Sequence, residues 1–161
     1  MSYKDDIKKE IALTYEYKEF NKSVEVIVEN IYLRALRESK LTGESIESIT
    51  YSILEGLDES LKENNKILIH TSIDKMIDSL YIRAIKNLQN KKQELKNLKD
   101  SLKENFNKNK EELKEILFTI ESFNKEKTIV ELDSYLKSAK NRVNQLIEKL
   151  NKEGGNTNSS H

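Results

Sequence analysis

The chain has 161 residues, enough for one domain with a hydrophobic core but not for two independent ones. It is 36% hydrophobic and 35% charged, which favours helices that each bury one stripe over a compact sheet sandwich. Basic and acidic residues both number 28, so no net charge recruits nucleic acid or anionic lipid. The absence of cysteine excludes disulfides, a thiolate nucleophile and cysteine-based metal centres.

The charge is unevenly divided along the chain. Residues 1–64 carry nine basic and fourteen acidic side chains, whereas residues 65–161 carry nineteen and fourteen. We interpret this division as an acidic half that folds back on a basic half. Self-association between opposite halves of two molecules is the alternative interpretation.

Proline is absent, glycine occurs four times, and the usual turn pairs of strand hairpins are missing, so the sequence predicts an all-α protein. A short amphipathic helix is predicted over residues 3–17. The most apolar helix, expected at the centre, spans 23–40, with Asn21 or Ser23 as its N-cap and Gly43 as its stop. A third helix follows over 44–63, in which Gly56 is predicted to permit close packing against a neighbour.

A turn at residues 64–66 precedes a fourth helix, for which Thr71 or Ser72 is the predicted cap. No stop signal follows, so the prediction is one continuous helix through residues 72–124, about 75 Å long at a rise of 1.5 Å per residue. The alternative is a kink or turn within 105–110, where three asparagines lower helix propensity.

Two apolar seams run along the C-terminal half of the chain. The first has an eleven-residue period that includes the polar Asn109, and the second lies on a last helix, 129–151, which Thr128 and Glu131 open as a capping box. The two seams predict a long protruding, coiled-coil-like helical hairpin of 88–123 and 129–150. The candidate interaction residues are Leu132, Leu136, Val143, Leu146, Leu150, Leu95, Leu98 and Leu102.

An internal repeat is the most informative feature of the sequence. Residues 23–37 (SVEVIVENIYLRALR) align with 72–86 (SIDKMIDSLYIRAIK) at an offset of 49, and a second similarity joins 57–64 to 98–105. We interpret them as a duplicated helix pair, with copy one at 23–64 and copy two at 72–105. Because copy two is shorter, its turn is predicted to be replaced by continuous helix. Repeated helices usually build extended surfaces rather than one catalytic cleft.

Residue patterns for catalysis or cofactor binding are missing. Neither His70 nor His161 follows a glutamate at the spacing of a carboxylate-bridged di-metal site, so no metal site is predicted, and we interpret His70 as a cap-region residue. There is no phosphate-binding glycine loop and no nucleophile elbow. Acid pairs such as Asp74 and Asp78 are expected on a solvated face. The lysines of 86–114 are spread around the helix, which disfavours nucleic-acid binding. No catalytic residue, cofactor or small-molecule substrate is predicted.

The sequence thus predicts an antiparallel helical bundle, a single domain over residues 1–151 with a disordered tail at 152–161. The expected function is a non-enzymatic structural or interaction protein that self-associates or binds a helical protein partner. Long amphipathic helices without proline also resemble, in general style, phasin-like and apolipoprotein-like proteins, so coating of a lipid or polymer surface is the alternative. With no apolar leader or membrane span in the sequence, a cytoplasmic location is expected. Richness in lysine, asparagine and isoleucine suggests a bacterial source.

Overall fold

The computed structural model describes residues 2–15, 23–92 and 98–155. These residues form no strand, and their α-helices are α1 (Tyr3–Tyr15), α2 (Val24–Thr42), α3 (Ile46–Ser60), α4 (Leu68–Lys92), α5 (Leu98–Lys127) and α6 (Val130–Leu150). A short 3-10 helix, η1 (Glu63–Asn65), joins α3 to α4, and a π-helical turn, η2 (Asn151–Gly155), follows α6. The predicted all-α class is confirmed. Residues 152–155 of the predicted disordered tail lie in η2, and residues 156–161 lie outside the described residues.

Polar caps and one glycine delimit the N-terminal helices. Ser23 and Ser45 are the N-caps of α2 and α3, and each hydroxyl accepts the backbone N–H of the residue three positions later. Gly43 ends α2 with a φ of 74°, a left-handed conformation that glycine adopts without steric cost. The predicted Ser23 cap and Gly43 stop are confirmed.

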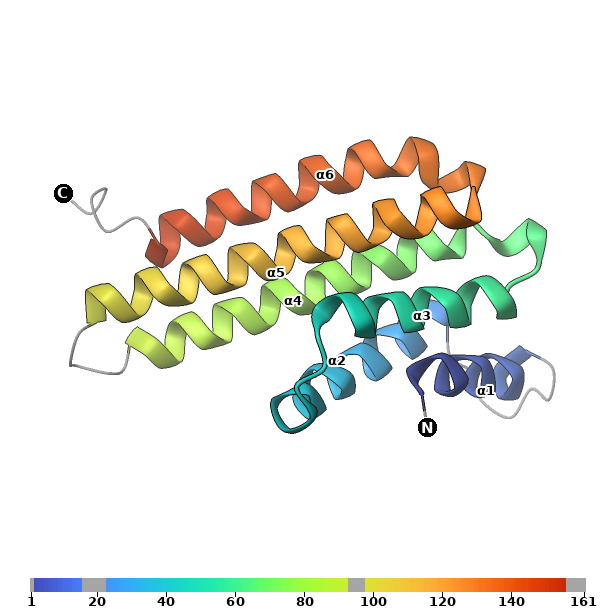
Figure 1. Cartoon of the computed structure of the whole chain (residues 1–161), viewed down its shortest axis with the longest axis horizontal. Helices are drawn as coiled ribbons and strands as arrows, with labels where there is room; N and C mark the ends of the chain where they lie inside the picture. Colours follow the sequence, from blue (N-terminus) through green and yellow to red (C-terminus); the bar gives the residue numbers. More distant parts are fainter. Residues whose placement is uncertain (1, 16–22, 93–97, 156–161) are drawn as a thin grey trace.

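Successive helices run in alternating directions, so that α2, α4 and α6 point one way and α1, α3 and α5 the other (Figure 1). The long helices α4, α5 and α6 pack on one another, and the shorter α1, α2 and α3 cover part of their length (Figure 1). α2 packs against α4 and α3 against α5, while α1 closes on α2 and α3. A single hydrophobic core therefore connects the N-terminal helices to the C-terminal ones.

Gly56 in α3 lies where α1 approaches most closely. A Cβ added at this position would lie 2.8 Å from the carbonyl oxygen of Lys4 and 2.9 Å from the Cβ of Ile7. Neither atom can move without moving α1 itself, so only glycine fits here. The approach buries Ile7 and Ile11 completely or nearly so. The prediction that Gly56 permits close packing is confirmed.

The predicted continuous helix through residues 72–124 is wrong. α4 ends at Lys92, α5 begins at Leu98, and the two helices pack antiparallel, with Arg83 of α4 paired to Glu112 of α5. The proposed kink at 105–110 is also wrong, because α5 runs through it unbroken. Reversal lets both helices bury their apolar stripes, at about 1.5–3 kcal/mol for each large side chain. Helix propensity differs by less than about 1 kcal/mol per residue and cannot oppose this gain.

The predicted protruding hairpin of 88–123 and 129–150 and the predicted loss of the turn in copy two both need correction. α5 and α6 are antiparallel neighbours, but both also pack on α4, and α5 packs on α3. The similarity between 57–64 and 98–105 does not join equivalent places, since the first segment ends α3 whereas the second begins α5. The prediction that copy two lost its turn is therefore wrong. In contrast, the repeat helices α2 and α4 are neighbours that run parallel (Figure 1).

The predicted cap of α4 is wrong as well. The helix begins at Leu68, and Ser72 lies inside it, where its hydroxyl donates to the Leu68 carbonyl at 2.7 Å. Thr71 also lies inside the helix, and its hydroxyl donates to the Glu25 carboxylate of α2 at 2.7 Å. A serine within an apolar helix can bond its own backbone in this way, so its presence alone does not mark a helix start.

Asn124 holds the turn between α5 and α6, in place of the predicted capping box. Its buried amide oxygen accepts the N–H of Ile129 at 3.1 Å, and its amide nitrogen donates to the Asp133 carboxylate at 2.6 Å. Ile129 is the N-cap residue of α6 and makes no side-chain cap bond, while the Thr128 hydroxyl bonds the preceding carbonyl. The capping-box prediction of Thr128 and Glu131 is therefore wrong.

Candidate functional site: the groove between α2 and α4

The predicted interaction residues lie mostly inside the molecule. Leu102, Leu132, Val143, Leu146 and Leu150 are buried, and Leu136 is half-buried against the core. Leu95 lies outside the described residues, and the side chain of Leu98, the first residue of α5, is not among those described. The seam of α6 thus packs against α4 and α5 of its own chain. Contact of these residues with another chain stays a prediction.

Polar contacts that the sequence analysis did not foresee also hold α6 to α4. The Tyr135 hydroxyl donates to Asp74, Arg142 pairs with Asp78, and the Tyr135 ring stacks on His70 with centroids 4.9 Å apart. Burial, together with the bond to Asp74, raises the pKa of the Tyr135 phenol well above its usual range, so it stays protonated and donating. Asp74 and Asp78 are partly exposed, in line with the expected solvated face, but both also bind α6.

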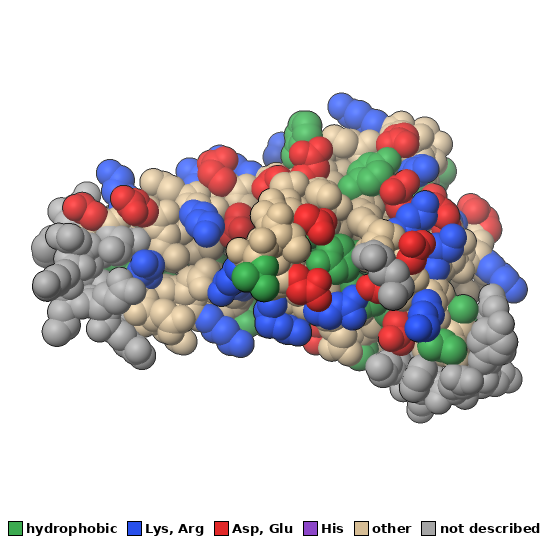
Figure 2. Space-filling model, turned by 60° about the horizontal axis from the view of Figure 1, so that its bottom comes forward, with side chains coloured by type: hydrophobic (Ala, Val, Ile, Leu, Met, Phe, Trp, Pro, Cys, Tyr) green, Lys and Arg blue, Asp and Glu red, His purple; other side chains and the backbone are tan. Residues whose placement is uncertain are grey.

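Ion pairs stay largely within each half of the chain, although the two halves pack together. Figure 2 shows acidic and basic side chains interspersed over the N-terminal helices, where Lys4 pairs with Glu59 and Arg34 with Asp6. Among the described residues, the ion pair between Lys66 and Asp58 is the one that joins the two halves. The acidic and basic halves are therefore joined mainly by apolar packing.

A groove of about 260 Å³ lies between the parallel helices α2 and α4, near their C-terminal ends. Its floor and walls are aliphatic, with Leu36 buried, Leu33 partly buried and Ile82 half exposed. Basic and amide side chains form the rest of the lining. The lining residues are Leu33, Leu36, Arg37, Lys40, Ile82, Arg83, Lys86, Asn87 and Asn90.

The charge of this groove is one-sided. Four of its lining residues are basic and none is acidic. Arg83 is neutralised by its ion pair with Glu112 of α5. In the part of the chain that the structure describes, no ion pair or side-chain hydrogen bond engages the exposed Arg37, Lys40 or Lys86. Three cations therefore surround an aliphatic floor, although the chain as a whole has no net charge.

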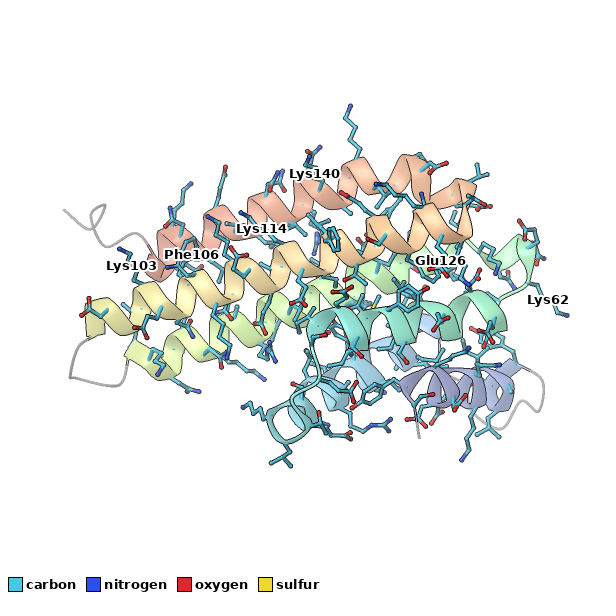
Figure 3. All side chains as sticks on the ribbon, viewed as in Figure 1. Lys62, Lys103, Phe106, Lys114, Glu126 and Lys140 are labelled. Carbon is cyan, nitrogen blue, oxygen red and sulfur yellow. The ribbon has the colours of Figure 1, made fainter. Side chains whose placement is uncertain are left out.

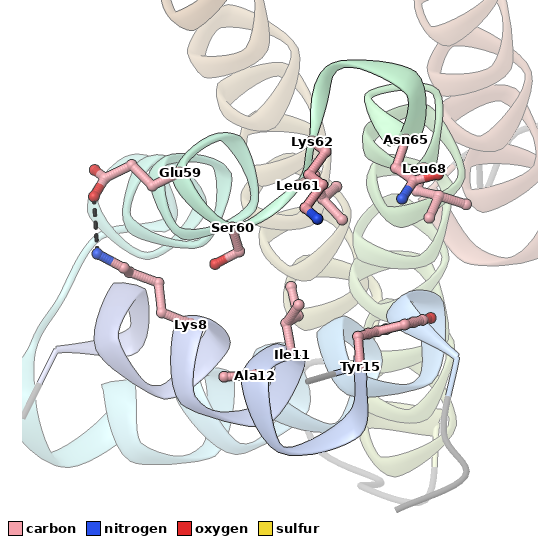
Figure 4. Close-up of a pocket in the computed structure, with 10 residues that line it drawn as sticks. All are labelled: Lys8, Ile11, Ala12, Tyr15, Glu59, Ser60, Leu61, Lys62, Asn65 and Leu68. Atoms are coloured by element: carbon pink, nitrogen blue, oxygen red, sulfur yellow. Dashed lines mark hydrogen bonds and ion pairs between the residues drawn. The ribbon is translucent and has the colours of Figure 1, made fainter. Parts of the chain in front are cut away.

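A second cavity, of about 400 Å³, lies between α1, the end of α3 and the start of α4 (Figure 4). Its rim carries both signs of charge, including the ion pair of Lys8 with Glu59 at 3.0 Å. Tyr15 lines it and is the last described residue before 16–22, so its wall is incomplete among the described residues. The groove between α2 and α4 is the better-defined candidate.

Comparisons of the chain with protein families, with curated proteins and with solved structures found no match. Within the described ranges, no group of three or more histidine, aspartate or glutamate residues is arranged to hold a metal ion. In the same ranges, every helix is too short or too polar to cross a bilayer.

Proposed function

We propose that this protein is a non-enzymatic interaction module that binds a helical protein partner, and that the groove between α2 and α4 is its docking site. The observation that carries this proposal is the open side of the parallel pair α2 and α4. On that side Leu33 and Ile82 remain accessible, with Ile82 50% exposed, and none of the described helices covers them. A further helix packed there would extend the helix-on-helix packing of the bundle.

The sequence repeat supports this choice of surface. At the offset of 49, Leu33 corresponds to Ile82 and Arg37 to Lys86, and all four residues line the groove. We infer that α2 and α4 derive from one duplicated helix and that their pairing created a surface neither helix has alone. Equivalent positions that face one groove are typical of binding surfaces in repeat proteins.

Self-association is the second form of the same function, with the partner a second copy of the chain. Light scattering over a wide concentration range distinguishes the two forms. Capture of a helical protein from source cells, followed by rebinding of that protein in purified form, tests the first. A protein that stays monomeric and rebinds no purified helical partner would refute both forms.

The surface-coating alternative needs a broad apolar face, and the exposed apolar side chains support it poorly. Phe118, Val130 and Leu41 are all well exposed, but they stand on α5, α6 and α2 rather than on one stripe. Single exposed apolar residues are normal for a folded protein. Flotation with lipid vesicles or polymer granules, together with a gain in helicity, would favour this alternative over a protein partner.

A further inference from the structure

The groove between α2 and α4 combines two features that together specify the chemistry of its occupant. Its floor is aliphatic, through Leu33, Leu36 and Ile82, and its free charges are all positive. The complement of such a surface is an apolar stripe flanked by carboxylates. This reasoning rests on the proposed function, since it assumes that the groove is a docking site.

The shape of the groove fits a helix. Its lining spans residues 33–40 of α2 and 82–90 of α4, about 10–12 Å at a rise of 1.5 Å per residue, or two helical turns. Helices pack at interaxial distances of about 8–10 Å with the ridges of one in the groove of another. A third helix laid over the parallel pair would place one apolar residue per turn on Leu33 and Ile82 and its flanking residues beside Arg37 and Lys86.

Other anionic partners fit less well. A nucleic-acid strand would gain from aromatic platforms for its bases, and none of the lining residues is aromatic. A bilayer surface is broad, whereas this aliphatic floor is narrow and lies between two helices.

We propose that the groove between α2 and α4 binds an acidic amphipathic helix of a partner protein, whose apolar stripe lies on Leu33 and Ile82 and whose carboxylates lie beside Arg37, Lys40 and Lys86. The cations give the interaction its selectivity and its dependence on salt, since exposed charges within one Debye length are screened as ionic strength rises. The aliphatic floor provides the apolar surface that becomes buried when the partner helix binds.

The test uses two synthetic helical peptides of about 21 residues, long enough to be helical in water. Both carry leucine at heptad positions a and d, and they differ only in having glutamate or lysine at the flanking e and g positions. Binding of each labelled peptide to the full chain is followed by fluorescence anisotropy at low and high salt. The glutamate peptide is expected to bind at least about tenfold more tightly than the lysine peptide, and its affinity is expected to fall as salt is added.

Charge reversal locates the site. The double variant Arg37→Glu/Lys86→Glu is expected to weaken binding of the glutamate peptide by about tenfold or more and to strengthen binding of the lysine peptide. The matched control is Lys103→Glu/Lys140→Glu, which makes the same change in net charge at exposed lysines of α5 and α6 that do not line the groove (Figure 3). This control should bind the glutamate peptide as the wild type does, apart from a small general effect of net charge.

Folding is controlled separately, because cations near helix C-termini also interact with the helix dipole. The milder pair Arg37→Gln/Lys86→Gln should give an intermediate loss of binding, with circular dichroism showing unchanged helix content. Ile82→Ser, at a half-exposed position, tests the role of the aliphatic floor. It should weaken binding of the glutamate peptide several-fold at any salt concentration.

The outcomes separate this inference from the proposed function. Equal binding of the two peptides, or equal effects of the groove and control reversals, would overturn the inference. The same holds if anionic vesicles or single-stranded DNA bind better than the glutamate peptide through the same cations. If a purified natural helical partner binds the wild type and the Arg37→Glu/Lys86→Glu variant equally, the inference fails and the proposed function stands. If no helical partner or peptide binds at all, both fail.

Discussion

Replacement of Gly56 by alanine reverses the usual effect of this substitution in a helix. At an ordinary helix position alanine is more stable than glycine by about 1 kcal/mol. In α3 the new Cβ would lie 2.8 Å from the Lys4 carbonyl oxygen and 2.9 Å from the Ile7 Cβ, both of which belong to the body of α1. Overpacking of this kind costs about 1–3 kcal/mol, and two contacts this short place it at the upper end. The gain of about 1 kcal/mol in helix propensity offsets part of this cost, so we expect Gly56→Ala to destabilise the protein by about 2 kcal/mol.

Complete release of α1 from the other helices sets the upper limit of the destabilisation by Gly56→Ala. That release would expose Tyr3, Ile7 and Ile11, each worth about 1.5–3 kcal/mol of burial. Partial displacement of α1 costs less free energy than this. The expected loss of about 2 kcal/mol lowers the melting temperature by about 4–8 °C for a chain of this size. Urea unfolding followed by circular dichroism measures the free energy, and amide hydrogen exchange of α1 shows whether that helix is the part that loosens.

Gly43 provides the matched control, because it needs glycine for a different reason. A Cβ there meets nothing within 4 Å, but the φ of 74° is left-handed. Gly43→Ala should cost about 1 kcal/mol from backbone strain, and Gly43→Asn less, since asparagine tolerates this conformation. At Gly56 the order is opposite, with asparagine worse than alanine. A Gly56→Ala variant as stable as the wild type, with unchanged exchange in α1, would refute the steric argument.

Three further predictions concern two residues of the turn between α5 and α6 and the ion pairs of Glu59. Asn124→Ala leaves the N–H of Ile129 buried without its acceptor and should cost about 1–3 kcal/mol in urea unfolding; an unchanged midpoint would contradict the role of this amide. Thr128→Gly should stabilise by about 1 kcal/mol, because Thr128 has a φ of 51°, and a lower melting temperature would refute this. Hydrogen bonds from Lys4 and Lys8 of α1 hold the pKa of Glu59 below its ordinary value of 4.5. Its contribution to stability is therefore present above pH 4.5 and lost as the pH falls through the lowered pKa. The protection factors of the α1 amides, which are corrected for the slower intrinsic hydrogen exchange at acid pH, should fall with acidification in the wild type and much less in Glu59→Gln.

Local signals in the sequence predicted the helices of the N-terminal half well. Ser23 and Gly43 act within their own helix ends, through one hydrogen bond and one backbone conformation, so short stretches of sequence carry the information. The close approach at Gly56 was also predictable as a feature, because an interior glycine is costly unless a neighbour needs the space. The identity of that neighbour, α1, was not.

The same local signals misled where distant segments decide the structure. Residues 87–124 contain no helix stop, yet α4 and α5 are separate helices that pack antiparallel, because this packing buries more apolar surface than a continuous rod. Thr128 and Glu131 match a capping box, yet Asn124 makes the bonds of that turn. An asparagine five residues before the N–H it accepts from leaves no recognisable pattern in the sequence.

The sequence by itself determined that this protein is helical, where most of its helices start and stop, and that α2 resembles α4, because these properties depend on residues within a few turns of each other. Only the tertiary structure decided that the predicted leucine seam of α6 is covered by the chain's own helices. It also placed Leu33, Ile82, Arg37 and Lys86 around one groove, because it set α2 and α4 side by side and parallel. A surface shared by two helices depends on their packing, and packing is a property of the whole chain.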